Sequence, residues 1–224
     1  VGEENLYKMI RGFGFGEKTG IALPGEEGGI LHPTSSWSKS SLASHSIGYG
    51  VSVTALQVLQ AMNVIANRGM LVPPRIAREA VDRSGFPPVP APAGARQVIS
   101  ERTAAELIDN IFAKVAIEGT AAMARLDGYT VAGKTGTAQR SIPGSRGYSS
   151  GRHLASFVGF VPASAPALSI IVVIDDPKAK FYYGGLVAAP VFREIARRSL
   201  LYLNQFPEFD PSRKVMTAQA RGED

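Results

Sequence analysis

Apolar residues recur at helical spacing in four segments of the chain, which predicts four helices. These segments are residues 3–13, 55–67, 101–117 and 187–203. The residues expected to face inward are, in chain order, Leu6, Met9, Ile10, Leu59, Met62, Ile65, Leu107, Ile108, Ile111, Phe112, Val115, Val191, Ile195, Ser199 and Tyr202. Local signals support three of the boundaries. Ser100 is placed to cap the helix at 101–117. Thr54 and Gln57 form a capping box, and Gly69 is placed to end the same helix in a left-handed conformation.

Three other segments favour strands. Residues 129–139 begin with strand-forming residues, residues 154–161 alternate imperfectly, and residues 168–174 are β-branched and nearly all apolar. The last pattern predicts a central, buried strand. Because the connections are short, the strands should be antiparallel, and helices should flank the sheet. The sequence therefore predicts an α+β fold.

Turn-forming and polar residues fill the rest. A short strand is expected at residues 76–83, a proline-rich loop at 84–94, a polar loop at 141–151 and a further loop at 178–186. We predict one domain over residues 1–204, followed by a polar tail, residues 205–224, that frays.

Composition excludes several classes of protein. The chain has 224 residues, no cysteine, and a net charge of +5 without a block of basic residues. Disulfides and thiolate metal sites are excluded, and nucleic acid is not expected as a partner. His32, His45 and His153 lack metal-ligand spacing, so neither a metal nor another cofactor is expected. No apolar run is long enough to span a membrane.

The strongest candidate for chemistry is Lys134-Thr135-Gly136-Thr137, inside the predicted strand at 129–139. Side chains alternate along a strand, so Thr135 and Thr137 should share a face, with Lys134 starting on the other. Gly136 leaves the backbone bare between them. Hydroxyls, an N–H group and a positive charge at a strand edge suit an extended peptide that ends in a carboxylate. A second Lys-Thr-Gly, at residues 18–20, is followed by turn signals and is interpreted as a turn.

Three other motifs fail in their context. Residues 128–135 match the phosphate loop GxxxxGK[ST], but the motif needs a preceding apolar strand and a following helix, and neither is predicted. Residues 147–151 match the nucleophile elbow GxSxG, but they lie in a loop before a strand. Ser36 to Lys39 match SxxK, where a serine nucleophile needs a helix, but this stretch is serine-rich. Ser36 is therefore only a weak candidate nucleophile.

Taken together, the motifs resemble those of class B penicillin-binding proteins, the cell-division and elongation transpeptidases. The resemblance covers about residues 1–204 and rests on segments that are specific jointly. They are 48–57 (GYGVSVTALQ), 118–120 (EGT), 131–138 (VAGKTGTA), 175–177 (DDP), 182–185 (YYGG) and 189–192 (APVF). It implies the fold shared by penicillin-binding proteins and serine β-lactamases.

The resemblance also implies roles for residues. Lys134 would polarise the site, Thr135 and Thr137 would bind the substrate carboxylate beside Gly136, and the Thr137 backbone N–H would form half of the oxyanion hole. Tyr182, Tyr183 and Gly184 resemble an aromatic loop at the pocket border. Tyr148 is a further border candidate. The implied reaction is serine acyl transfer that cross-links peptidoglycan stem peptides, with β-lactams acylating the same serine.

The sequence departs from the family in one respect. It contains no SxN triplet, and its SxxK lies too close to Lys134 for the family layout. The chain therefore resembles the C-terminal part of a transpeptidase domain, with the nucleophile, and any membrane anchor, lying upstream. We expect it to be inactive alone. Its implied partners are stem peptides, β-lactams, the upstream half of its own domain and divisome or elongasome membrane proteins. The implied location is the periplasmic, extracytoplasmic face of the bacterial inner membrane.

Three alternatives remain open from the sequence. The chain is a non-catalytic binding module of the same fold if no upstream SxxK and SxN exist. A P-loop protein would respond to nucleotide and magnesium. A serine β-lactamase fits the segment 182–185 and the long C-terminal helix less well.

Overall fold

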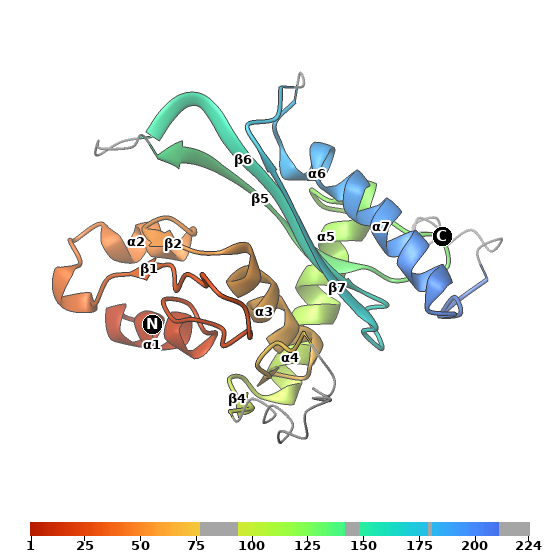
Figure 1. The fold of residues 1–224 in the computed structure, drawn as a ribbon, viewed down its shortest axis with the longest axis horizontal. Coiled ribbons are helices and arrows are strands. Elements are labelled where there is room, and N and C mark those ends of the chain that lie inside the picture. Colours follow the sequence, from red (N-terminus) through yellow and green to blue (C-terminus); the bar gives the residue numbers. More distant parts are fainter. Residues whose placement is uncertain (77–93, 142–147, 179–180, 211–224) are drawn as a thin grey trace, which may run out of the picture.

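The computed structural model describes residues 1–76, 94–141, 148–178 and 181–210 (Figure 1). Its elements are, in chain order, α1 (Glu3–Gly12), β1 (Ile30–Leu31), η1 (Thr34–Ser36), α2 (Ser41–Ser46), β2 (Val51–Ser52), α3 (Ala55–Ala66), β3 (Met70–Leu71), β4 (Arg96–Gln97), α4 (Glu101–Leu107), η2 (Ile108–Phe112), α5 (Ala113–Ile117), η3 (Ala122–Ala124), β5 (Ala132–Ser141), β6 (Tyr148–Val161), β7 (Leu168–Asp175), α6 (Gly184–Val187) and α7 (Ala189–Tyr202). Helices and antiparallel strands together confirm the α+β class. Apart from Ile76 and Gly94, the expected strand at 76–83 and the proline-rich loop lie outside the described residues.

β5, β6 and β7 form an antiparallel sheet in that order. β5 pairs with β6 from Ala132 opposite Phe160 to Gln139 opposite His153, and β6 pairs with β7 up to Leu154 opposite Asp175. The first two strands run further than predicted, since β5 continues to Ser141 and β6 already begins at Tyr148. β5 also starts later than expected, at Ala132 rather than at Tyr129.

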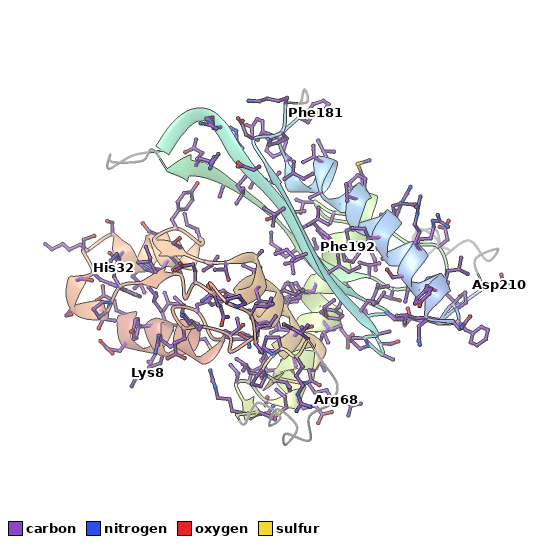
Figure 2. The ribbon with its side chains drawn as sticks, in the orientation of Figure 1. Lys8, His32, Arg68, Phe181, Phe192 and Asp210 are labelled. Carbon is purple, nitrogen blue, oxygen red and sulfur yellow. The ribbon has the colours of Figure 1, made fainter. Side chains whose placement is uncertain are left out.

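The sheet lies between two helical layers, each of which buries one of its faces (Figure 1). On one face, Phe157 of β6 packs edge-on against Phe192 of α7, with ring centroids 4.7 Å apart. Figure 2 shows Phe192 between α7 and the sheet. On the other face, Val158 and Phe160 pack with Met62 and Ile65 of α3. Adjacent residues of β6, such as Phe157 and Val158, therefore face different cores.

Local signals set the helix boundaries as predicted. The Thr54 hydroxyl accepts from Gln57 N–H, and the Gln57 side chain accepts from Thr54 N–H, so the capping box of α3 is complete. Gly69 follows α3 with φ +86°. The Ser100 hydroxyl accepts from Thr103 N–H at the start of α4.

The predicted helix at 101–117 contains an irregularity. Its middle turn, η2, is π-helical, and the extra residue shifts the face that meets the core. Ile111, which the periodicity directs inward, is 48% exposed, whereas Ala113 and Ala116 are buried. The prediction for Ile111 is therefore wrong. The prediction for Met9 of α1 is wrong as well, since Met9 is also 48% exposed.

Two burial predictions at the C-terminal end are also wrong. α7 buries Ala189, Phe192, Ala196 and Leu200, while Val191, Ile195 and Tyr202 are exposed. β7 is an edge strand of the described sheet, not a central one, and Val173 is 41% exposed. The reason is the same at both places: the described residues do not cover this surface.

The first part of the expected tail is anchored rather than frayed. Glu208 N–H donates to Gly128 O at 2.8 Å, and its carboxylate accepts from Thr130 N–H and the Ser164 hydroxyl. The Tyr129 hydroxyl donates to Gln205 O at 2.6 Å. Residues 205–210 therefore pack against the segment that leads into β5.

Candidate functional site

β5 carries Lys134-Thr135-Gly136-Thr137 along a strand edge. β6 pairs with one side of β5, and the described residues place no strand on its other side. The free edge offers backbone N–H and C=O groups to an added strand. It can therefore accept an extended peptide by backbone hydrogen bonds.

Side chains of β5 alternate between the two faces as predicted. Val131 belongs to the core beneath α7 and Ala132 to the core beneath α3, so Thr135 and Thr137 point with Val131 and Lys134 points with Ala132. The Lys134 ammonium bends back and donates to the Thr135 carbonyl at 3.0 Å. The lysine thus bends around its own strand to reach the backbone of Thr135, as a joint site with the two threonines requires.

Both threonine hydroxyls have partners on other elements. Thr135 Oγ1 lies 2.8 Å from Thr120 Oγ1, just beyond α5. Thr137 Oγ1 accepts from Gly184 N–H at 3.2 Å, at the start of α6. These contacts fix the two side chains against the body of the protein, with the strand edge left open.

Glycines make this close packing possible. A Cβ at Gly184 would lie 2.1 Å from Ser156 O and 2.6 Å from Gly136 O. A Cβ at Gly136 would lie 2.5 Å from Ser156 Oγ, a side chain on the next strand. The Gly184 loop therefore rests directly on the backbones of β5 and β6.

Exposed aromatic rings lie beside this loop. The Tyr182 ring stacks on His153 of β6, with centroids 3.9 Å apart and planes 13° apart. Tyr182 also contacts Tyr183, whose hydroxyl lies 3.4 Å from its own, and this hydrogen bond raises the pKa of Tyr182. His153 pairs with Gln139, which lies two residues after Thr137 on β5. The stacked rings therefore lie next to the Lys134–Thr137 segment. The sequence predicted Tyr182 and Tyr183 but missed His153, which carries no motif.

Two further residues are candidates from the sequence. Tyr148 pairs with Ser141 at the far end of β5, and its side chain lies outside the described residues. Ser36 ends the short helix η1, and its exposed hydroxyl donates to Pro33 O at 2.8 Å. Trp37 is extended, so Lys39 does not follow Ser36 on a helix. The SxxK geometry is absent here.

The structure also shows the conformation of the other three motifs. No helix follows Lys134-Thr135, because β5 continues through them, so a phosphate loop is excluded. Ser149 lies within β6 rather than in the predicted loop, and no elbow forms there. The first Lys-Thr-Gly, residues 18–20, lies in an irregular segment between the turns at 13–16 and 24–25, and Thr19 N–H and its hydroxyl both donate to Glu26.

Within the described ranges, no cluster of three or more histidine or acidic side chains is placed to hold a metal ion. Over the same residues, no helix has the length and apolar content to cross a bilayer.

Comparisons with known proteins identify the family of the chain. Residues 1–197 match the family described as the penicillin-binding protein transpeptidase domain. Stage V sporulation protein D of Bacillus subtilis is 42% identical over 92% of this chain and 32% of its own length. Penicillin-binding protein PbpB of Mycolicibacterium smegmatis is 39% identical over 88% of this chain and 31% of its own.

Solved structures give the same result. Penicillin-binding protein 3 of Mycobacterium tuberculosis, crystallised with ampicillin, aligns with a TM-score of 0.84 at 37% identity, over 95% of this chain and 48% of that one. The transpeptidase domain of penicillin-binding protein 3 from Burkholderia pseudomallei aligns with a TM-score of 0.78 at 33% identity, over 92% and 60%. The chain spans about a third of the length of the curated relatives.

Proposed function

The chain belongs to the penicillin-binding protein transpeptidase domain family, and we propose that it supplies the substrate-binding strand of a peptidoglycan D,D-transpeptidase. The observation that carries this proposal is β5, whose open edge presents Lys134, Thr135 and Thr137 together. Residues 1–204 would belong to the transpeptidase domain and residues 205–224 to its tail.

The substrate would lie along β5 as an extra strand. The stem peptide ends in D-alanyl-D-alanine, and the hydroxyls of Thr135 and Thr137 would donate to its terminal carboxylate. The ammonium of Lys134 adds a positive charge on the same edge. Gly136 has no side chain to separate the substrate backbone from β5. Tyr182 and Tyr183 would border the substrate at the end of β5 where His153 lies.

The chemistry would be acyl transfer through a serine. The serine oxygen attacks the penultimate D-alanine carbonyl and forms an ester with it. The peptide bond breaks, and the terminal D-alanine leaves with a free amino group. An amine of a second stem peptide then displaces the serine and forms the cross-link. The Thr137 N–H would stabilise the oxyanion in both steps, a contribution of about 3–4 kcal/mol in comparable sites. β-Lactams would acylate the same serine.

We propose that the serine lies in the upstream half of the same domain. The sequence has no SxN, and Ser36 lacks the helix that SxxK requires. The open edge of β7 and the exposed residues Val191 and Ile195 of α7 are suitable surfaces for that half. The chain alone would bind substrate without turning it over. This differs from a non-catalytic module, which has no upstream nucleophile.

The proposed place of action is the extracytoplasmic face of the inner membrane, where peptidoglycan is assembled. One relative is named for sporulation, as Stage V sporulation protein D. Divisome or elongasome proteins are proposed partners, alongside stem peptides and β-lactams.

The test is covalent labelling with a fluorescent penicillin, read as a mass shift of the intact polypeptide. We expect no shift on the chain alone and a shift on the upstream half when both halves are mixed. Lys134→Ala should lower the labelling rate by about a hundredfold. Lys18→Ala, in the other Lys-Thr-Gly, is the matched control and should leave the rate unchanged. Labelling of a serine within residues 1–224, or an equal effect of both variants, would refute the proposal.

A further inference from the structure

Thr120 is placed to act on the substrate-binding strand without belonging to it. It follows α5, three residues beyond Ile117, and is 15 residues before Thr135 in the sequence. Its Oγ1 nevertheless lies 2.8 Å from Thr135 Oγ1, within hydrogen-bonding distance. Either hydroxyl can be the donor in the free protein.

Tight backbone packing around Thr120 holds it close to Thr135. Ala121 N–H donates to Val115 O at 3.1 Å, which folds the chain back onto the end of α5. Gly119 has no room for a side chain, because a Cβ would lie 2.8 Å from Val115 Cα. On the other side a Cβ at Gly185 would lie 1.8 Å from Thr120 O and 3.4 Å from Thr135 Cγ2. Two glycines thus allow the Thr120 backbone to approach both α5 and α6.

The chemistry of the ligand decides which hydroxyl donates. A hydroxyl carries one proton, and a carboxylate only accepts hydrogen bonds. When Thr135 gives its proton to a carboxylate, the bond between the two threonines must run from Thr120 to Thr135. Thr137 is arranged in the same way, because Gly184 N–H can only donate to it and leaves its own proton free.

We propose that Thr120 is a positioning residue, which donates its hydroxyl proton to Thr135 Oγ1 and so directs the Thr135 proton toward the substrate carboxylate. This inference rests on the proposed function of β5. It deepens that function by naming the group that sets the donor direction at the strand. A donor bond received by Thr135 also polarises its hydroxyl, which strengthens the bond that it gives.

The matched variants are Thr120→Val, which keeps the shape and removes the hydroxyl, and Thr120→Ser, which keeps the hydroxyl. The probes are N-acetyl-D-alanyl-D-alanine and its C-terminal amide, titrated into the 224-residue chain and followed by NMR, which measures millimolar affinities. The amide both donates and accepts, so it does not require one direction of the threonine pair.

We expect Thr120→Val to weaken binding of the carboxylate peptide about three- to tenfold, with a smaller effect on the amide, and Thr120→Ser to restore it. Equal carboxylate affinity in Thr120→Val and the wild type would overturn the inference. So would an equal loss for both peptides, or a loss that Thr120→Ser shares, since these mark a general structural role. If the wild-type chain binds neither peptide, the proposed function fails and the inference fails with it.

Discussion

Gln57 gives the sharpest test of how the N-terminal segment is attached to α3. Its side chain is fully buried, a rare environment for a glutamine. Its amide donates to Glu17 O and to Gly28 O, each at 2.7 Å, and its carbonyl accepts from Thr54 N–H at 2.9 Å. One side chain therefore satisfies three backbone groups from three parts of the chain.

Gln57→Leu keeps the volume and removes all three hydrogen bonds. A buried group left without its partner costs about 1–3 kcal/mol, and the apolar side chain recovers about 1–2 kcal/mol of this by burial. We place the cost per group near the low end of this range, at about 1–2 kcal/mol, because two of the three groups are carbonyls in loops. After the recovery by burial, we expect the three together to lower the free energy of unfolding by about 2–4 kcal/mol.

The assay is urea denaturation followed by circular dichroism. Asn63→Leu is the control, because Asn63 is an exposed residue of the same helix and should change stability by less than about 0.5 kcal/mol. If Gln57→Leu and Asn63→Leu have the same denaturation midpoint, the three hydrogen bonds do not hold the segment to α3, and the argument fails.

Three further predictions concern a carboxylate, a glycine and a core aromatic residue. Burial raises the pKa of Glu26, but hydrogen bonds from the Thr19 hydroxyl and from the N–H groups of Thr19 and Gly20 outweigh it and hold the pKa below its ordinary value. The unfolded chain then binds the proton more tightly, so this stabilisation is present above the ordinary pKa and is lost as pH falls through the lowered one; Glu26→Gln should flatten the acid limb of the unfolding midpoint against pH. Gly184→Ala places a Cβ 2.1 Å from Ser156 O and should displace the loop, lowering penicillin labelling of the mixed halves about a hundredfold. Gly12→Ala, where the nearest atom is 3.6 Å away, should not. Phe192→Ala removes a fully buried ring from the face beneath α7 and should cost about 3–5 kcal/mol in urea denaturation, whereas truncation of exposed Tyr202 should cost little.

Local chemistry made much of the fold predictable. Thr54, Ser100 and Gly69 satisfy or end backbone hydrogen bonding within one turn, so their effect does not depend on the rest of the molecule. The alternation of Thr135 and Lys134 follows from strand geometry in the same way. Features that depend on a distant segment were not predictable. The partners of Thr135 and Thr137 are Thr120 and Gly184, and nothing in the spacing of these residues indicates contact.

Helix periodicity failed where the chain changed its own geometry or used small residues. The π-helical turn η2 adds a residue to one turn, and a fixed period of 3.6 then assigns Ile111 to the wrong face. In α7 the pattern favoured larger side chains, but Ala189 and Ala196 allow the helix to approach the sheet closely. Volume complementarity, which a single sequence does not display, decided the buried face of α7.

Three of the remaining errors have a common direction. Val173, Val191 and Ile195 were expected to be buried and are exposed, and they belong to β7 and to the helix that packs on it. Apolar side chains on an outer strand and an outer helix are favoured when another part of the protein, or a partner, covers them. The open edge of β7 adds unpaired backbone groups beside them. The proposed upstream half would cover these surfaces. It would supply a strand that pairs with β7 and apolar residues that pack on α7.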